Sequence, residues 1–370
     1  MARLDAAFDG WIKAQQAAID VVRGAPDVPR TEWDVAEGYR WVTRLASLAQ
    51  DWFVEKSDPA HPQLFLLQDE YRKLLVDNPD TRYLFAVLED HRRYRLTGRR
   101  GDAAYVGLTF GTPIGRGAVG GRTGTLTQVH LDQFDLGPDG EVDIVIAPAP
   151  ALGEPPPRNS VPLVPGTGQL AIRETFLDRR SGRPSDLRIE LLDPEPPPRL
   201  TPAALAPALE MAGLFLQFVA AGAHEMWKAT EGPVNRFSGT AGSHHVDAQE
   251  DEVRSHSDAD MTYHGGRWVL GPDEALRVTV HEPERAFLYW GLTITSPLME
   301  SYDYRYTNTS LNNHTATRSD DGSWELLIAP EDPGHRNWLD AGGRREGYMI
   351  VRWVLADDPP HPSCELVSLA

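Results

Sequence analysis

Two histidines and two aspartates in the C-terminal third of the chain are the residues best suited to acid–base chemistry: His314, His335, Asp332 and Asp340. Histidine titrates near neutral pH, and a neighbouring carboxylate can fix its tautomer. The four residues fall on two neighbouring loops of a predicted β unit. We therefore predict a histidine–aspartate pair that transfers protons in catalysis.

Aromatic rings, amides and a guanidinium accompany this predicted pair. Aromatic faces would supply contact area for a ring-shaped or hydroxylated ligand, and the polar groups would fix its orientation. The predicted substrate-binding residues are Tyr304, Asn312, Asn313, Asn337, Trp338 and Arg352. A structural interpretation competes with this one, because DPG from Asp332 and DAGG from Asp340 are typical of turns, and Trp338 would also fit a core.

A polar segment upstream of these loops is rich in histidine. Its metal-ligand candidates are His244, His245, His256 and His264. Histidine and carboxylate are ligands for zinc and non-haem iron. Their spacing matches no compact metal motif, and adjacent histidines rarely ligate one ion. We therefore favour a solvated loop that covers the site over a metal centre, and we predict no cofactor.

The chain repeats itself in four places, in one order. YVGLTF at 105–110 recurs as YWGLTI at 289–294, and PDGEVDIVIAPAP from Pro138 recurs as DDGSWELLIAPED from Asp320. The Asn159 and Arg173 motifs recur around Asn337 and Arg352, so all four offsets lie between 178 and 184 positions. This indicates a duplicated unit. Residues kept in both copies are expected to hold the fold, which gives Asn337 and Arg352 a structural interpretation beside the ligand-binding one.

The elements that would position these residues begin with helices. Apolar residues at spacings of three and four predict an amphipathic helix from Trp33. A second helix is expected over residues 64–76, ended by the turn sequence DNPD from Asp77. Thr201 and Pro202 suit the N-cap and first position of a long helix ending near residue 232.

Short strands punctuated by glycine and proline fill most of the remaining sequence. This pattern is typical of antiparallel sandwiches and jelly rolls rather than parallel sheets. We predict a mainly β fold with α elements, in which two duplicated antiparallel jelly-roll or sandwich-like units are joined by a long helix. The predicted parts are a helical region at 1–80, a first β unit at 81–192, a Pro-rich connector and helix at 193–232, a His-rich insertion at 233–267 and a second β unit at 268–370.

Composition limits the function classes. A net charge of −18 over 370 residues argues against nucleic acid and anionic membrane surfaces as partners. The apolar stretch 211–223 is too short to span a bilayer, and the N-terminus does not resemble a signal peptide, so we expect a cytoplasmic protein. The single cysteine, Cys364, excludes an intrachain disulfide.

The C-terminal sequence resembles a known bacterial family. SLN at 310–312, DG at 321–322, DPG at 332–334, NWLD at 337–340 and RW at 352–353 are similar to the signature of the family catalogued as domain of unknown function 1214. AEGYRWVTRL from Ala36, NPDTRYLFAVL from Asn78 and YRLTGRRG from Tyr94 resemble its long members. The resemblance implies a jelly-roll-like β domain and supplies no reaction or catalytic residues.

Two functional hypotheses follow. The first is an enzyme that acts on a small hydroxylated or partly apolar organic substrate by His/Asp acid–base chemistry in the second β unit. The alternative is a non-catalytic carbohydrate- or lipid-binding or assembly protein. Both expect a small-molecule ligand and allow a homo-oligomer.

Overall fold

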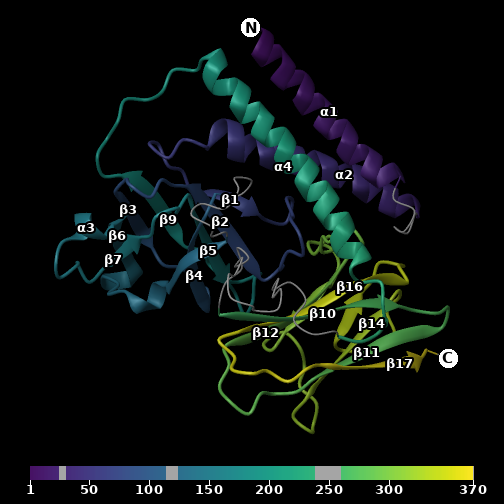
Figure 1. Ribbon diagram of the computed structural model, residues 1–370. Coiled ribbons are helices and arrows are strands. Elements are labelled where there is room, and N and C mark those ends of the chain that lie inside the picture. Colours follow the sequence, from purple (N-terminus) through teal and green to yellow (C-terminus); the bar gives the residue numbers. More distant parts are fainter. Residues whose placement is uncertain (25–30, 114–123, 238–259, 370) are drawn as a thin grey trace.

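A layer of long helices lies beside two β units (Figure 1). The computed structural model describes residues 1–24, 31–113, 124–237 and 260–369. The long helices are α1 (Ala2–Gly24), α2 (Glu32–Ala49) and α4 (Pro202–Lys228), with the short α3 (Ala149–Leu152) inside the first β unit. A π-helical segment, η1 (Gln50–Glu55), continues α2, and two 3₁₀ turns, η2 (Leu131–Gln133) and η3 (Pro138–Gly140), lie in loops.

Local sequence explains where α2 and α4 begin. The Thr31 hydroxyl accepts from the Asp34 amide at 3.1 Å, while the Asp34 carboxylate accepts from the Thr31 amide at 3.1 Å, which forms a capping box. The Thr201 hydroxyl caps α4 by accepting from the Ala204 amide at 3.2 Å, and Pro202 occupies the first helical turn. Both starts agree with the sequence prediction.

The helix layer packs on the first β unit through aromatic rings. Trp52 of η1 lies 4.4 Å from Phe85 and 5.3 Å from Phe215 of α4, measured between ring centroids. Small residues let α1 and α4 approach closely, since a Cβ added at Gly213 would lie 3.4 Å from the Ala14 Cβ. The helices therefore form a covering layer for the sheet rather than a separate bundle.

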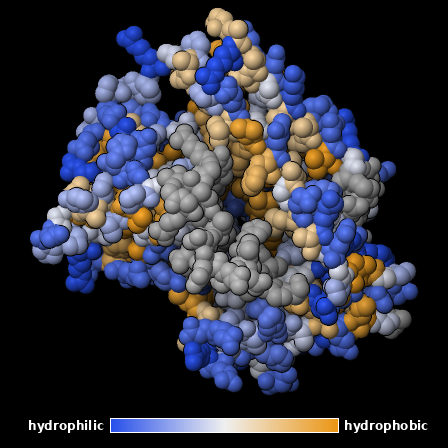
Figure 2. Space-filling view, in the orientation of Figure 1, coloured by the Kyte–Doolittle hydropathy of each residue, from blue (hydrophilic) through white to orange (hydrophobic). Residues whose placement is uncertain are grey.

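Helix α4 is long and apolar enough to cross a membrane by length and composition alone. The length of the apolar stretch 211–223 argued against a membrane span in the sequence. This stretch lies within the 27-residue helix α4, so the argument from its length does not apply to the whole helix. In the structure α4 lies along α1, and 44% of its apolar window is buried. The cores of soluble proteins also contain helices of this length and composition. Leu214 and Phe218 remain exposed, and Figure 2 shows apolar residues on the surface of this layer.

The first β unit consists of two sheets that enclose one apolar core. One sheet has the order β1 (Phe65–Gln68), β2 (Thr81–Val87), β8 (Gln169–Thr175), β4 (Tyr105–Gly111) and β5 (Thr125–His130). The other has the order β7 (Ser160–Leu163), β6 (Glu141–Pro148), β3 (Tyr94–Arg99) and β9 (Asp186–Leu191). Leu108 and Ile172 of the first sheet and Leu96 and Ile144 of the second are fully buried between them.

The second β unit repeats this arrangement. One sheet has the order β10 (Met261–Val269), β16 (Glu346–Val354), β12 (Tyr289–Thr295) and β13 (Ser310–Asn312). The other has the order β15 (Trp338–Asp340), β14 (Trp324–Ala329), β11 (Glu274–Val280) and β17 (Ser363–Ser368). Strands β10 to β17 thus occupy the places of β2 to β9, strand for strand. The predicted fold class, with two duplicated sandwich-like units and a helix between them, is confirmed.

Three details differ from the sequence prediction. The first is strand direction, because β6–β7 and β14–β15 pair in parallel while the other pairs are antiparallel. In each parallel pair, the connection returns to the end at which the first strand began, so the second strand runs in the same direction. Each unit is therefore a mixed sandwich.

The second difference is the helix expected over 64–76, where the structure has strand β1. Phe65 and Leu67 contact the helix layer, whereas Leu64 and Leu66 pack against the sandwich core. Both faces of this segment are thus apolar, which hides the period of two in the sequence. Pairing with β2 at the sheet edge decides the conformation.

The third difference is the start of the second unit. Strand β10 begins at Met261, inside the predicted insertion 233–267, and pairs with β16 along its whole length. Tyr263 lies opposite Arg352, as Tyr83 lies opposite Arg173 in the first unit. His244, His245 and His256 lie outside the described residues.

Candidate functional site

Two reciprocal hydrogen bonds join the β units. The Tyr289 hydroxyl donates to Asp80 at 2.9 Å, and the Tyr105 hydroxyl donates to Asp260 at 2.9 Å. Tyr105 and Tyr289 are equivalent in the repeat. Asp80 directly precedes β2 and Asp260 directly precedes β10, so the two aspartates are equivalent as well. Each tyrosine therefore bonds to the aspartate of the other unit, which gives the interface a pseudo-twofold character.

Gly291, two positions after Tyr289, leaves room for the tyrosine side chain. A Cβ added at Gly291 would lie 1.9 Å from the Tyr289 hydroxyl oxygen. The glycine leaves the space that the phenol crosses on its way to Asp80. This explains the Tyr-x-Gly pattern in the second copy, YWGLTI, as a requirement of the interface.

Asp80 is the more buried of the two aspartates, at 2% exposure. Besides Tyr289, it accepts from Asn312 Nδ2 at 2.9 Å and pairs with Arg179 Nη1 at 3.0 Å. A buried carboxylate needs such partners, because its desolvation is otherwise unfavourable. Asp80 thus ties together the first unit, its β8–β9 loop and strand β13 of the second unit.

Asp260 has a different set of partners, which sequence reasoning did not identify. It accepts from Gln128 Nε2 at 2.5 Å, and His130 Nε2 lies 2.5 Å from the same carboxylate oxygen. His130 pairs with Gly107 across β4–β5, as Asn312 pairs with Gly291 across β12–β13. The duplicated interface therefore holds histidine at the position where the second unit has Asn312. Asp80 and Asp260 are 180 residues apart, which lies within the range of the repeat offsets. This spacing could have identified the two aspartates as equivalent from the sequence.

A cleft of about 420 Å³ opens beside the Asp80–Arg179 pair, between the two units. It is lined by Asp80, Asp178, Arg179, Arg180, Asn308, Ser310, Leu311, His314 and Thr315. Arg180, His314 and Thr315 are exposed. The pKa of Asp178 is lowered by the Ser181 hydroxyl and the Arg180 amide, with a smaller contribution from His314. His314 and Asp178 are therefore electrostatic neighbours in an accessible polar cleft.

The predicted histidine–aspartate pairs do not form within the described part of the chain. His335 Nδ1 accepts from the Asn337 amide at 3.2 Å, and its Nε2 lies 3.5 Å from Glu325 rather than from an aspartate. Asp332 accepts from the Gly334 amide at 2.8 Å, and Asp340 accepts from the Gly342 amide at 2.7 Å. Both carboxylates cap glycine turns, so the turn interpretation accounts for them.

The predicted amides also hold loops. Asn312 is fully buried, and its Oδ1 accepts from the amides of His314 and Thr315 at 2.9 Å each. Asn313 bonds to the backbone of Trp290 and Leu288.

Asn337 and Trp338 lie away from the cleft lining. Asn337 accepts from the Thr317 amide at 2.7 Å and donates to the Thr317 and Glu325 carbonyls at 2.7 and 2.8 Å. Trp338 packs on the outer face of its sheet and donates to the Ala329 carbonyl at 3.1 Å. Asn159 bonds to the Asp135 backbone in the first unit, so the duplicated asparagines have the predicted structural role.

Arg352 and Tyr304 connect the second unit to the segment before β2. Arg352 is 4% exposed and donates to the Val76 and Asp77 carbonyls. The Tyr304 ring lies under Lys73 Nζ at 4.7 Å and Arg179 at 5.2 Å, and burial raises the pKa of its hydroxyl. Tyr304 lines a second cleft, of about 310 Å³, on the other side of the Asp80–Arg179 pair. Of the predicted set, His314 is the residue exposed in the inter-unit cleft.

His264 is a buried side chain without a metal-site environment. It is 2% exposed, neither ring nitrogen has a hydrogen-bond partner among the described residues, and its ring lies 4.2 Å from that of His361. Burial, and then the proximity of His361, lowers the pKa of His264 to about 4. The described residues contain no group of three or more histidine, cysteine, aspartate or glutamate side chains that could hold a metal ion.

Comparisons with known proteins match the second β unit to a family model and the whole chain to a solved structure. The family model described as protein of unknown function, DUF1214, matches residues 266–357. An uncharacterised protein from Burkholderia cenocepacia, known from its crystal structure, is 30% identical over 100% of this chain and 99% of its own, with a TM-score of 0.88. The crystal structure of the VPA0106 protein from Vibrio parahaemolyticus covers 95% of this chain and 100% of its own at 13% identity, with a TM-score of 0.50, which shows a shared fold.

A comparison with curated proteins gives no match. The similarity to the Burkholderia protein extends over both β units and the helix layer. The matched residues 266–357 cover most of the second β unit. The chain thus contains a DUF1214 region at residues 266–357 and is similar over its whole length to the uncharacterised Burkholderia protein.

Proposed function

We propose that the protein binds a small hydroxylated carboxylate in the cleft between its two β units. The observation that carries this proposal is the convergence of charged side chains of both signs from two units on one accessible cleft of about 420 Å³. Arg180 and His314 offer donors to an anionic group, while Asp178 offers an acceptor to a hydroxyl. Ligand sites commonly combine a concave surface with a few polar groups that fix orientation.

The role of each side chain follows from its bonding. Arg179 is occupied by Asp80, so it shapes the cleft wall. Among the described residues no ion pair occupies the exposed Arg180 guanidinium, which leaves it available to a carboxylate. Asn312 holds the backbone of His314 and Thr315, so these residues are presented on a rigid turn. A preorganised cleft of this kind favours a specific small ligand.

Thermal unfolding and calorimetry with glycerate and gluconate test the proposal. We expect saturable binding of at least one of them, weakened about tenfold by Arg180→Gln. Arg188→Gln, which changes an exposed arginine on β9 outside the cleft, is the matched control and should bind as the original chain does. Loss of affinity in both variants, or in neither, would contradict the cleft as the binding site.

Acid–base catalysis is the second candidate, favoured by the position of His314 beside Asp178. In this candidate function the predicted catalytic histidine, His314, is kept. Its carboxylate partner is Asp178, since Asp332 and Asp340 cap turns. His314 would take a proton from a ligand hydroxyl, and Asp178 would stabilise the imidazolium. If a glycerate or gluconate ligand is recovered unchanged after long incubation, the binding function stands alone. If product forms, His314→Gln should remove turnover and leave binding measurable.

A further inference from the structure

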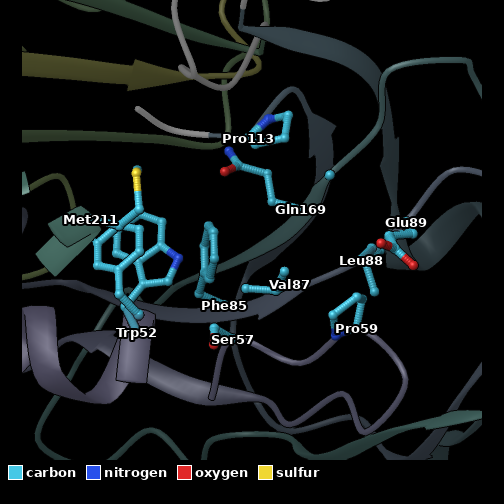
Figure 3. Close-up of a pocket in the computed structure, with 12 residues that line it drawn as sticks. Trp52, Ser57, Pro59, Phe85, Val87, Leu88, Glu89, Pro113, Gln169 and Met211 are labelled. Carbon is cyan, nitrogen blue, oxygen red and sulfur yellow. The ribbon is translucent and has the colours of Figure 1, made fainter. Parts of the chain in front are cut away.

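A separate, mainly apolar pocket of about 130 Å³ lies between the helix layer and the first β unit, with Ser57 and Glu89 also on its lining (Figure 3). Trp52 and Phe53 of η1 form one wall, Phe85 and Val87 of β2 form the floor, and Met211 of α4 closes one side. Trp52 and Phe53 stack at 5.1 Å with an interplanar angle of 10°. The pocket is thus a small cavity with aromatic walls, next to a π-helical segment of the kind often found at functional sites.

One buried amide faces this apolar environment. Gln169, the first residue of β8, is 4% exposed and lies opposite Val87 in the sheet. Its Oε1 is buried and has no hydrogen-bond partner among the described residues. Figure 3 shows the amide end of Gln169 on the side of the pocket where Met211 and Pro113 lie. A buried acceptor left unpaired is unfavourable, so a bound molecule that donates a hydrogen bond would satisfy it.

The second β unit fills the corresponding place with side chains. Tyr348 lies opposite Arg267 there, as Gln169 lies opposite Val87 in the first unit. Tyr348 is buried in a cluster with Trp227 and Met299, and Arg267 lies 4.2 Å from the Trp227 ring. The pocket and its unpaired amide are therefore a property of one copy of the duplicated unit, which separates them from the residues that both copies need for folding.

We propose that this pocket binds a small monocyclic phenol. A cavity of about 150 Å³ lined by apolar residues accommodates benzene, so the volume here suits a single ring. The ring packs against Trp52, Phe53 and Phe85, where offset and edge-to-face aromatic contacts are favourable. Met211 adapts to the ring because its thioether side chain is flexible. The phenol hydroxyl donates to Gln169 Oε1.

Calorimetric titration of the full chain with phenol and with toluene tests this assignment. Phenol should bind saturably and more tightly than toluene, since only phenol donates to Gln169. Gln169→Leu should weaken phenol binding about tenfold and leave toluene binding unchanged. Met211→Trp should abolish binding of both, because the larger side chain fills the pocket. Leu214→Trp, on the exposed side of the same helix, is the control and should change neither affinity.

Equal affinities for phenol and toluene in the original chain would overturn the role of Gln169, and unchanged binding in Met211→Trp would overturn the pocket. If Gln169→Leu does not fold, as judged by circular dichroism, the comparison of phenol with toluene on the original chain still decides. The proposal is independent of the inter-unit cleft, so Arg180→Gln should bind phenol with unchanged affinity.

Discussion

Tyr289 donates its hydroxyl hydrogen bond to Asp80 of the other β unit at 2.9 Å, and the repeat-equivalent tyrosine makes the same bond in the opposite direction. The strongest sequence repeat, YVGLTF and YWGLTI, is therefore an interface motif. Its tyrosines lie where the two units meet, packed in one cluster with Val354. Duplication of the unit supplied both halves of this contact, which explains why the motif persists in both copies.

The first prediction compares the two tyrosines with each other. Tyr289→Phe should lower the free energy of unfolding by about 1–3 kcal/mol, because it removes a donor from a buried carboxylate. Tyr105→Phe should cost less, since the side chain of Asp260 is 25% exposed and water can replace the hydroxyl, whereas Asp80 is 2% exposed. Urea unfolding of both variants measures the difference. Equal losses would contradict the unequal burial of the two aspartates.

The second prediction concerns the glycine that leaves room for the phenol. Gly291→Ala should displace the Tyr289 ring and destabilise the protein by about 1–3 kcal/mol, because the added Cβ would overlap the hydroxyl. Gly222→Ala is the control, since a Cβ there meets nothing within 4 Å and the site lies inside helix α4. That change should stabilise by about 1 kcal/mol. The two alanines should therefore shift the urea midpoint in opposite directions.

Much of the fold could be predicted from sequence because duplication provides an internal comparison. The repeated landmarks identify the two units, and the cap at Thr201 marks the start of the long helix α4. Strand β1 could not be predicted in the same way, because Phe65 and Leu66 are apolar on opposite faces and the alternation disappears. Strand β10 was hidden because its repeat partner shares few residue types with it beyond Tyr263.

The candidate site was less predictable, because its contacts join residues far apart in sequence. Asp80 meets Asn312 and Tyr289 only when the two units dock, and no local pattern encodes that meeting. The structural interpretation of the repeated Asn337 is supported by its bonds to loop backbone. The presence of His314 in one copy predicts a role outside the shared scaffold, and this stays a prediction; its carboxylate neighbour, Asp178, lies in the other unit.

The third prediction concerns Glu300, a buried carboxyl next to the helix layer. Burial raises its pKa to about 8, although Arg44, whose Nη1 lies 2.8 Å away, and Lys73 oppose this shift. The folded state therefore holds one more proton than the unfolded state between about pH 4.3 and pH 8. In that window this group lowers the free energy of unfolding as pH rises, by about 1 kcal/mol per pH unit.

Glu300→Gln tests this dependence, because glutamine cannot titrate. Urea unfolding at pH 6 and pH 8 should show a smaller loss of stability with rising pH in the variant than in the original chain. Glu282→Gln, which removes an exposed carboxylate paired with Arg318, should keep the original pH dependence. The comparison uses slopes against pH, so the uniform cost of removing the Arg44 partner does not affect it. Identical slopes in the original chain and Glu300→Gln would contradict the raised pKa.

The fourth prediction concerns His264, whose burial disfavours the charged ring. Its pKa is lowered to about 4, so between about pH 6.5 and pH 4 the unfolded state binds a proton that the folded state does not. The free energy of unfolding should therefore fall as pH decreases through this window, by about 1 kcal/mol per pH unit. His264→Phe keeps a ring beside His361 without titrating, so it should weaken this acid sensitivity. His91→Gln changes a 70%-exposed histidine and should leave it intact, and thermal unfolding at pH 7 and pH 5 distinguishes the two.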